Sequence, residues 1–119
     1  MAMLAQALVA LIALLHVYFV LLETVLFETR GRRVFGLSAD KAAVLKPAMS
    51  NQGCYNGFLV AALALGLFHP DAAIAHAFTV YGLACVAVAG LWGAATVKKS
   101  ILYIQGLPAM VALALVLAL

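Results

Sequence analysis

LAQALVALIALLHVYFVLLETVLF, residues Leu4–Phe27, is an almost unbroken run of apolar side chains near the start of the chain. A helix needs about 20 apolar residues to cross the hydrocarbon core of a bilayer, and this run is long enough. It is too long for the apolar core of a signal peptide, and no basic residue precedes it. We therefore expect the run to remain in the protein as a membrane anchor.

The rest of the chain has the same character, since 68% of the 119 residues are hydrophobic and 9% are charged. One soluble core of this size could not bury so much apolar surface, so the bilayer is the expected solvent. Apolar stretches predict helices at about 4–27, 51–68, 72–96 and 101–119. The predicted fold is all-α: a four-transmembrane-helix bundle that forms a single integral membrane domain over residues 1–119.

The basic residues indicate how this bundle is oriented. Five of the seven lie in the connection 28–50, and the other two directly follow the third apolar stretch. Cytoplasmic connections of membrane proteins collect Lys and Arg. The pattern predicts a multi-pass protein of the bacterial inner membrane, with both termini on the extracytoplasmic side and 28–50 as a basic cytoplasmic connection. A short interfacial helix is expected there around Ser38–Leu45, with Ser38 as its N-cap.

The second predicted helix opens with SNQGCYNGF, residues Ser50–Phe58. Polar side chains in hydrocarbon are unfavourable unless they face a partner, a cavity or a ligand. Gln52, Tyr55 and Asn56 lie three or four residues apart and share one helix face, and Asn51 precedes them. These four are candidate ligand-binding residues. The alternative is that they only make structural hydrogen bonds between helices.

Glycines mark the faces on which helices are expected to pack. Gly53 and Gly57 form a small-x-x-x-small face in the second predicted helix, and Gly90 and Gly93 lie in the third. Such residues let a neighbouring helix approach closely. The neighbour could belong to the same chain or to a second copy, so a homo-oligomer is left open.

Ionisable residues recur along the first predicted helix. His16, Glu23 and Arg30 are spaced seven residues apart and so share one face. Glu23 lies near the cytoplasmic end and His16 lies deeper. A carboxylate in a wet cavity can act as an acid, a base or a counter-ion, so Glu23 and His16 are the catalytic candidates. The alternatives are an ion pair between Glu23 and Arg30 or a lysine, and an interhelical hydrogen bond from His16.

Trp92 and Gln105 complete the candidate site. Judged from helix rise, both lie within about two turns of the cytoplasmic surface, as Glu23 and Asn56 do. We expect a polar pocket at this leaflet with His16 at its floor. Its lining would be Glu23, Gln52, Tyr55, Asn56, Trp92 and Gln105. For Trp92 the alternative is an aromatic anchor at the membrane interface.

Several common kinds of site have no counterpart in the sequence. No stretch matches a phosphate-binding loop, a dinucleotide fingerprint, a nucleophile elbow or a zinc motif. No third ligand accompanies His69 and Asp71, so we predict neither a metal site nor a cofactor. Basic and aromatic residues do not interleave, which argues against nucleic-acid binding. Cys54 and Cys85 fall in different predicted helices at different depths, and both are interpreted as small apolar residues.

Motifs spread over the chain resemble those of a known family. They are NQGCYNGF at Asn51–Phe58, ETRGRRVF at Glu28–Phe35, GAAT at Gly93–Thr96 and QGLPA at Gln105–Ala109, together with His16. The chain resembles the small bacterial integral membrane family catalogued as domain of unknown function 1304. The resemblance implies a four-helix membrane protein and no established activity, so no catalytic residue is carried over.

The expected function is binding. The pocket would receive the head group of a lipid, a quinone or another amphiphile, with membrane lipids as its partners. One alternative is a membrane-embedded enzyme that acts on such an amphiphile, with Glu23 or His16 as acid or base. The others are a small proton-coupled transporter and a purely structural protein whose polar residues lock helices together.

Overall fold

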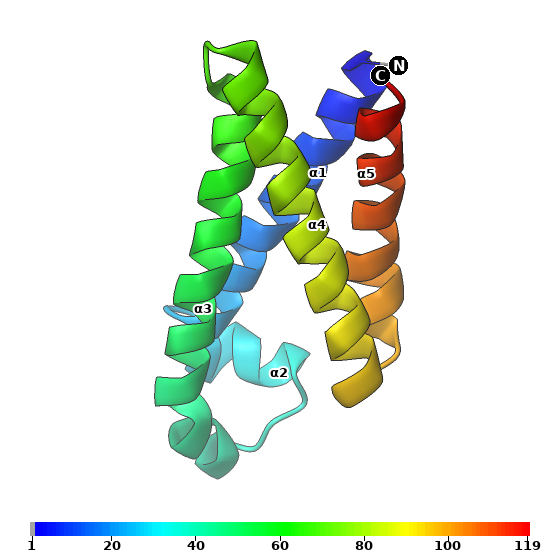
Figure 1. Ribbon diagram of the computed structural model, residues 1–119. Helices are drawn as coiled ribbons and strands as arrows, with labels where there is room; N and C mark the ends of the chain where they lie inside the picture. Colours follow the sequence, from blue (N-terminus) through cyan, green and yellow to red (C-terminus); the bar gives the residue numbers. More distant parts are fainter. Residues whose placement is uncertain (1) are drawn as a thin grey trace. The chain divides into compact units, whose positions relative to one another are not determined.

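The structure is a computed structural model that describes residues 2–119, and all regular structure in that range is helical (Figure 1). Two of the elements are single π-helical turns, which carry the labels η1 and η2. In chain order the elements are α1 (Ala2–Glu23), η1 (Phe27–Gly31), α2 (Arg32–Val34), α3 (Ala39–Phe68), α4 (Ala72–Thr96), η2 (Leu102–Gly106) and α5 (Leu107–Ala118).

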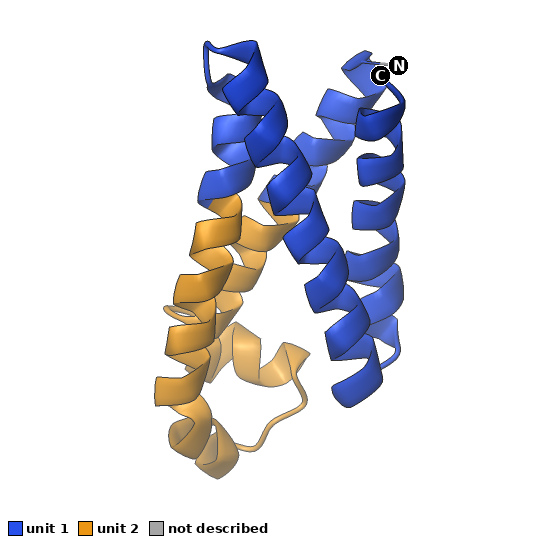
Figure 2. Ribbon diagram, in the orientation of Figure 1, with its two compact units in different colours: residues 1–13, 61–119 blue, residues 14–60 orange. Residues whose placement is uncertain are grey.

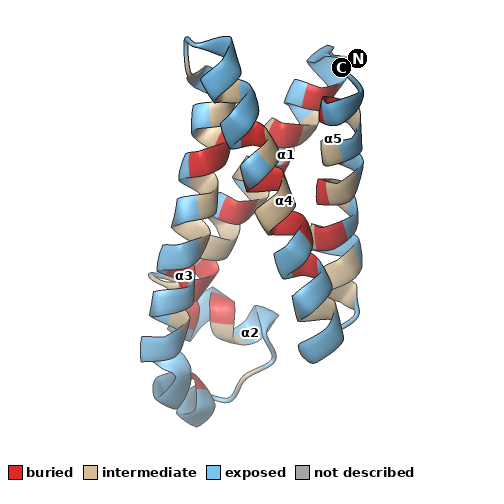
Figure 3. Cartoon of the chain, in the orientation of Figure 1, coloured by how far each residue is buried: buried red, intermediate tan, exposed pale blue. Residues whose placement is uncertain are grey.

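Two of the described helices, α1 and α4, are long and apolar enough to cross a membrane, with 22 and 25 residues. Figure 3 shows that both helices have many exposed positions. Large apolar side chains are among them, since Leu11 and Leu14 of α1 are 63% and 67% exposed. Exposed apolar area on this scale is unusual for a protein surrounded by water. Lipid chains cover such a surface without penalty, so these helices are typical of a membrane protein.

The buried faces of the helices are rich in small residues. On α5 the buried positions are Ala109, Ala112 and Val116. On α4 they are Thr79, Gly82, Leu83, Val86, Ala87 and Gly90. Spacings of three and four residues place each set on one side of its helix. Small side chains let the helix backbones approach closely, which is how helices pack in a membrane.

The described chain divides into two compact units (Figure 2). Unit 1 contains Met1–Ala13 and Ala61–Leu119, and unit 2 contains Leu14–Val60. The boundaries fall inside α1 and inside α3. Each unit is considered separately below.

In unit 1, α4 packs against both α5 and η2. Gly90 of α4 faces the backbone of Gly106, and a Cβ atom at Gly90 would collide with it. At the other end of α4, Asp71 is the N-cap: its Oδ1 atom accepts hydrogen bonds from the N–H groups of Ala73 and Ile74, at 2.9 and 3.1 Å. This cap satisfies two of the donors that a helix start leaves without a partner.

In unit 2 the chain folds back on itself after α1. Gly31, the last residue of η1, lies so close to the carbonyl group of Leu22 that no Cβ atom would fit there. The rings of Phe27 and Phe35 contact each other, with centroids 6.3 Å apart. The chain then turns at Gly36, whose φ of 69° favours glycine. The basic segment is therefore packed against the end of α1.

The helix bounds differ from the expected ones at several places. The fourth predicted helix, 101–119, is the π-helical turn η2 followed by α5, and α1 begins at Ala2. α1 ends at Glu23 instead of Phe27, and α3 begins at Ala39 instead of Asn51. The interfacial helix expected around Ser38–Leu45 is thus the first part of α3, and the Ser38 hydroxyl accepts a hydrogen bond from the Lys41 N–H at 3.2 Å. Alanine, leucine and lysine, which favour helix, are frequent between Ala39 and Ser50, and the helix continues through Pro47. For α4 the observed and expected bounds coincide.

Candidate functional site

Glu23 is the last residue of α1 and is 5% exposed. The helix stops here because the next hydrogen bonds change pattern: both Thr24 and Leu26 donate their N–H groups to the Leu21 carbonyl, at 3.4 and 2.9 Å. The Thr24 hydroxyl donates to the carbonyl of Val20 at 2.6 Å. These hydrogen bonds connect the residues directly after Glu23 to the last turn of α1 and so fix the backbone from which the Glu23 side chain extends.

Two amides of α3 approach this carboxyl group. The Asn56 side chain donates a hydrogen bond from Nδ2 to Oε1 of Glu23, and the Gln52 side chain also hydrogen-bonds the carboxyl group. Gln52 and Asn56 are four residues apart, so both lie on the same face of α3. Asn56 is half-buried and Gln52 is exposed. We call Glu23, Gln52 and Asn56 the Glu23 cluster.

Gly53 allows the two helices to come this close in unit 2. A Cβ atom at Gly53 would lie 2.6 Å from Cγ2 of Thr24 and 3.3 Å from Cβ of Glu23. Both distances are shorter than ordinary van der Waals contact. The backbone of α3 therefore lies directly against the last turn of α1, and the amides on either side of Gly53 reach the carboxyl group.

Other candidates on α3 lie away from the Glu23 cluster. Tyr55 is 62% exposed, and its ring contacts Phe58 of the same helix edge-on, with centroids 5.5 Å apart. Asn51 is exposed, and a Cβ atom at Gly57 would meet nothing within 4 Å. These three residues belong to the outward face of α3 within unit 2.

His16 is fully buried on α1, and its ring lies edge-on to Phe19 with centroids 5.1 Å apart. It precedes Glu23 by two helical turns, or about 10 Å of rise. Arg30 does not pair with Glu23: its Nε atom donates to the hydroxyl of Tyr18 at 2.6 Å, and its guanidinium carbon lies 5.6 Å from the centre of the Tyr18 ring.

The remaining candidates belong to unit 1. Trp92 is 72% exposed on α4, beside a shallow apolar depression, and Gln105 is half-buried in η2. The depression is lined by Val88, Leu91, Trp92, Ala95 and Thr96. Gly90 packs on Gly106, as described, and a Cβ atom at Gly93 would lie 3.0 Å from a methyl carbon of the Ile101 side chain.

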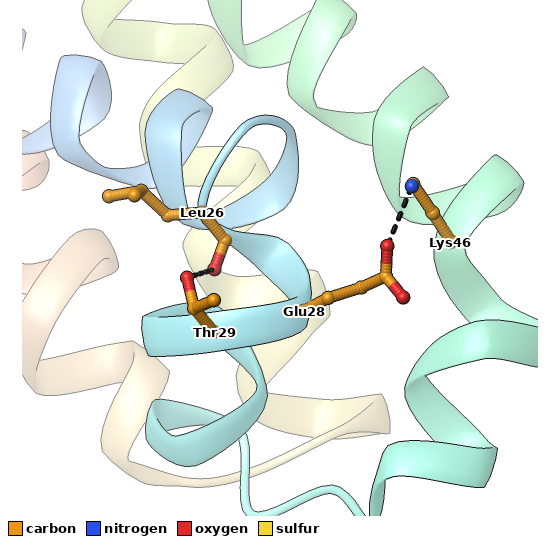
Figure 4. A network of polar contacts seen from close by, with 4 residues as sticks. All are labelled: Leu26, Glu28, Thr29 and Lys46. Atoms are coloured by element: carbon orange, nitrogen blue, oxygen red, sulfur yellow. Dashed lines mark hydrogen bonds and ion pairs between the residues drawn. The ribbon is translucent and has the colours of Figure 1, made fainter.

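Lys46, a basic residue of α3, has a partner other than Glu23. Lys46 forms an ion pair with Glu28, with Nζ and Oε1 2.6 Å apart (Figure 4). Both side chains are about half exposed, so the pair contributes about 0–1 kcal/mol at most. Among the described residues, no three His, Cys, Asp or Glu side chains gather where they could hold a metal ion. The chemistry of the cluster is therefore that of one carboxyl group and two amides.

Two residues with side-chain contacts near the end of α1, Thr24 and Tyr18, were not among the sequence candidates. Thr24 follows Glu23 directly, and threonine in a helix often bonds the carbonyl four residues earlier, so this contact had a recognisable signal. Tyr18 gave no such signal, because its contact with Arg30 depends on the π-helical turn η1.

The comparisons with known proteins add one positive finding. The model of a family described as "Protein of unknown function (DUF1304)" matches residues 10–117. The chain belongs to the DUF1304 family. This match confirms the resemblance noted from the sequence. It covers both units, so the Glu23 cluster lies within the DUF1304 region. No curated protein and no solved structure matches the chain.

Proposed function

We propose that the protein crosses the bacterial inner membrane four times, with both termini on the extracytoplasmic side. Each of its two basic segments then lies in the cytoplasm, as the distribution of Lys and Arg favours. α1 and α4 are two of the spans, and the apolar parts of α3 and of η2 with α5 are the others. In unit 1, the first turns of α1 and the last turn of α5 lie at the same end of that unit, as expected if both termini are on one side of the membrane (Figure 1).

Within this topology, the Glu23 cluster binds the head group of an amphiphile at the cytoplasmic leaflet. The observation that carries the proposal is a buried carboxyl group at the end of an apolar helix, with two amides of a second helix bound to it. Polar groups at membrane depth are unfavourable and commonly mark binding sites. The exposed Gln52 leaves one side of the cluster open to a ligand. Apolar faces of the helices, such as that of α1, would contact the tail.

Native mass spectrometry of the gently extracted protein tests this function. The wild-type protein should retain an amphiphile, and Asn56→Leu should reduce the retained fraction about tenfold or more, because one hydrogen-bonding partner is lost. Gln52→Leu changes an exposed residue of the same cluster and should act in the same direction. Cys54→Leu, at an exposed position of the same helix, is the matched control.

The same variants identify a purely structural cluster. If the amides only hold α3 against α1, Asn56→Leu will lower the unfolding temperature in detergent, and the retained amphiphile will be the same in all variants. A wild-type protein that carries no amphiphile would also contradict the proposed function.

A further inference from the structure

Among residues 2–119, no cationic side chain forms an ion pair with the Glu23 carboxyl group. Its interactions in the structure are with the amides of Asn56 and Gln52. Two of the basic residues that follow α1 have other partners: Arg30 is bound to Tyr18, and Lys46 is paired with Glu28. A buried carboxylate is normally paired with a positive charge or fully hydrogen-bonded, because leaving water is unfavourable for an ion.

The two amides stabilise a carboxylate but do not neutralise it. Each amide N–H that points at the carboxyl group leaves the side-chain carbonyl oxygen of the same residue to accept a further hydrogen bond. Among the described residues, the Asn56 side chain is hydrogen-bonded to Glu23 through Nδ2, and Gln52 is exposed. With Glu23 ionised, the cluster offers one negative charge and two neutral oxygen acceptors.

From this arrangement we infer that the Glu23 cluster selects an ammonium head group. The inference rests on the function proposed above and specifies its ligand class. A primary ammonium supplies both the missing positive charge and three hydrogen-bond donors, which match the carboxylate and the amide oxygens. A phosphate or carboxylate head group would instead bring a second negative charge close to Glu23, which is unfavourable at low dielectric.

Single-chain probes with the same tail test the selection. Hexadecylamine, hexadecanol and hexadecyl phosphate share a tail and differ in head group: a cationic donor, a neutral donor and an anion. In native mass spectrometry titrations of the protein in detergent, hexadecylamine should bind about tenfold or more tightly than hexadecanol, because bonds to charged groups are stronger. Hexadecyl phosphate should not compete with it.

Glu23→Gln is the decisive variant. It keeps the size and hydrogen-bonding capacity of the side chain and removes the charge, so the preference for hexadecylamine over hexadecanol should disappear. Glu28→Gln removes a carboxylate that is exposed and already paired with Lys46, so it should leave the preference unchanged. Circular dichroism of each variant verifies that the helices are intact. If Glu23→Gln does not fold, Glu23→Asp takes its place: it keeps the charge and should retain part of the preference for hexadecylamine.

The outcomes separate the inference from the function on which it rests. Equal or tighter binding of hexadecyl phosphate or hexadecanol, weakened by Asn56→Leu, would overturn the ammonium head group and leave the binding site standing. If no probe binds in a way that depends on Asn56 or Glu23, the proposed function itself is overturned.

Discussion

Gly53 shows how a single missing side chain shapes the candidate site. It faces the last turn of α1, between the two amides that reach Glu23. The nearest group, the methyl carbon of Thr24, cannot simply rotate away, because the hydroxyl of the same side chain is bonded to the Val20 carbonyl at 2.6 Å. Any added atom at Gly53 must therefore push the helices apart.

Gly53→Ala should destabilise the protein by about 1–3 kcal/mol, the usual penalty of an overpacked contact. It should also weaken the bond between Asn56 and Glu23, since α3 has to move. Thermal unfolding in detergent measures the first effect, and retention of hexadecylamine measures the second.

Gly57→Ala is the matched control on the same helix, because a Cβ atom there would meet nothing within 4 Å. Alanine favours helix over glycine by up to about 1 kcal/mol, so this variant should be neutral or slightly more stable. Equal destabilisation by both substitutions would contradict the close contact at Gly53.

At residue level, the sequence predicted the members of the Glu23 cluster better than their neighbours. Spacing placed Gln52 and Asn56 on one helix face, and the structure brings both to Glu23. Tyr55 has nearly the same spacing, yet it lies on the outward side, since a residue three positions from Gln52 and one from Asn56 is at the edge of that face. Periodicity gives the face to within about a quarter of a turn, and packing decides the remainder.

At the level of the elements, the end of α1 explains why Arg30 could not be placed by counting residues. A seven-residue spacing keeps side chains on one face only while the helix is a regular α-helix. α1 stops at Glu23, and the chain continues through a turn into the π-helical η1, which has more residues per turn. The phase of the helix is lost there, and Arg30 meets Tyr18 instead of Glu23.

The start of α4 was the easier element to predict. The apolar stretch predicted a helix over 72–96, and the structure has α4 beginning at Ala72 with Asp71 as its N-cap. The start of α3 was harder, because the apolar stretch begins only at residue 51, whereas the helix begins at Ala39 and continues through Pro47. Capping residues act locally and can be recognised in a sequence, whereas tolerance of a proline depends on neighbouring hydrogen bonds.

Asp71→Ala should lower stability by about 0.5–2 kcal/mol, because the N–H groups of Ala73 and Ile74 lose their acceptor. Asp71→Asn keeps an oxygen acceptor at the same place and should retain most of the stability. Unfolding temperatures of the two variants in the same detergent make the comparison. A loss of the same size in both would show that the negative charge, and not the acceptor, stabilises the helix start.

At the scale of the whole molecule, the apolar composition predicted an all-helical membrane protein. The described residues form helices as their only regular structure, and two of these helices are long and apolar enough to cross a membrane. The proposed orientation depends on the basic residues. Arg30, Arg32 and Arg33 lie between α1 and α3, Lys41 and Lys46 lie in the first part of α3, and Lys98 and Lys99 lie between α4 and η2. Charge distribution is a property of the chain as a whole, so it can be read without knowing a single contact.

Cysteine labelling in intact cells checks this orientation. Cys54 and Cys85 are both free and are first replaced by alanine. Pro70→Cys should then react with a membrane-impermeant maleimide added outside, because residue 70 lies in the turn proposed to be extracytoplasmic. Lys99→Cys should react only after the membrane is opened. The reverse labelling pattern would show that the proposed topology is inverted.

The length of α3 has a consequence for the lipids around the protein. Its apolar part, Phe58–Phe68, has 11 residues and rises about 16 Å, about half the thickness of the hydrocarbon core. A short apolar span is accommodated by local thinning of the bilayer or by water that reaches its polar end. In the proposed orientation, the inner leaflet would dip beside Asn51–Gly57, and lipid head groups would be drawn to the level of Glu23. The membrane would then be deformed toward the site, so that an amphiphile could reach it without leaving its leaflet.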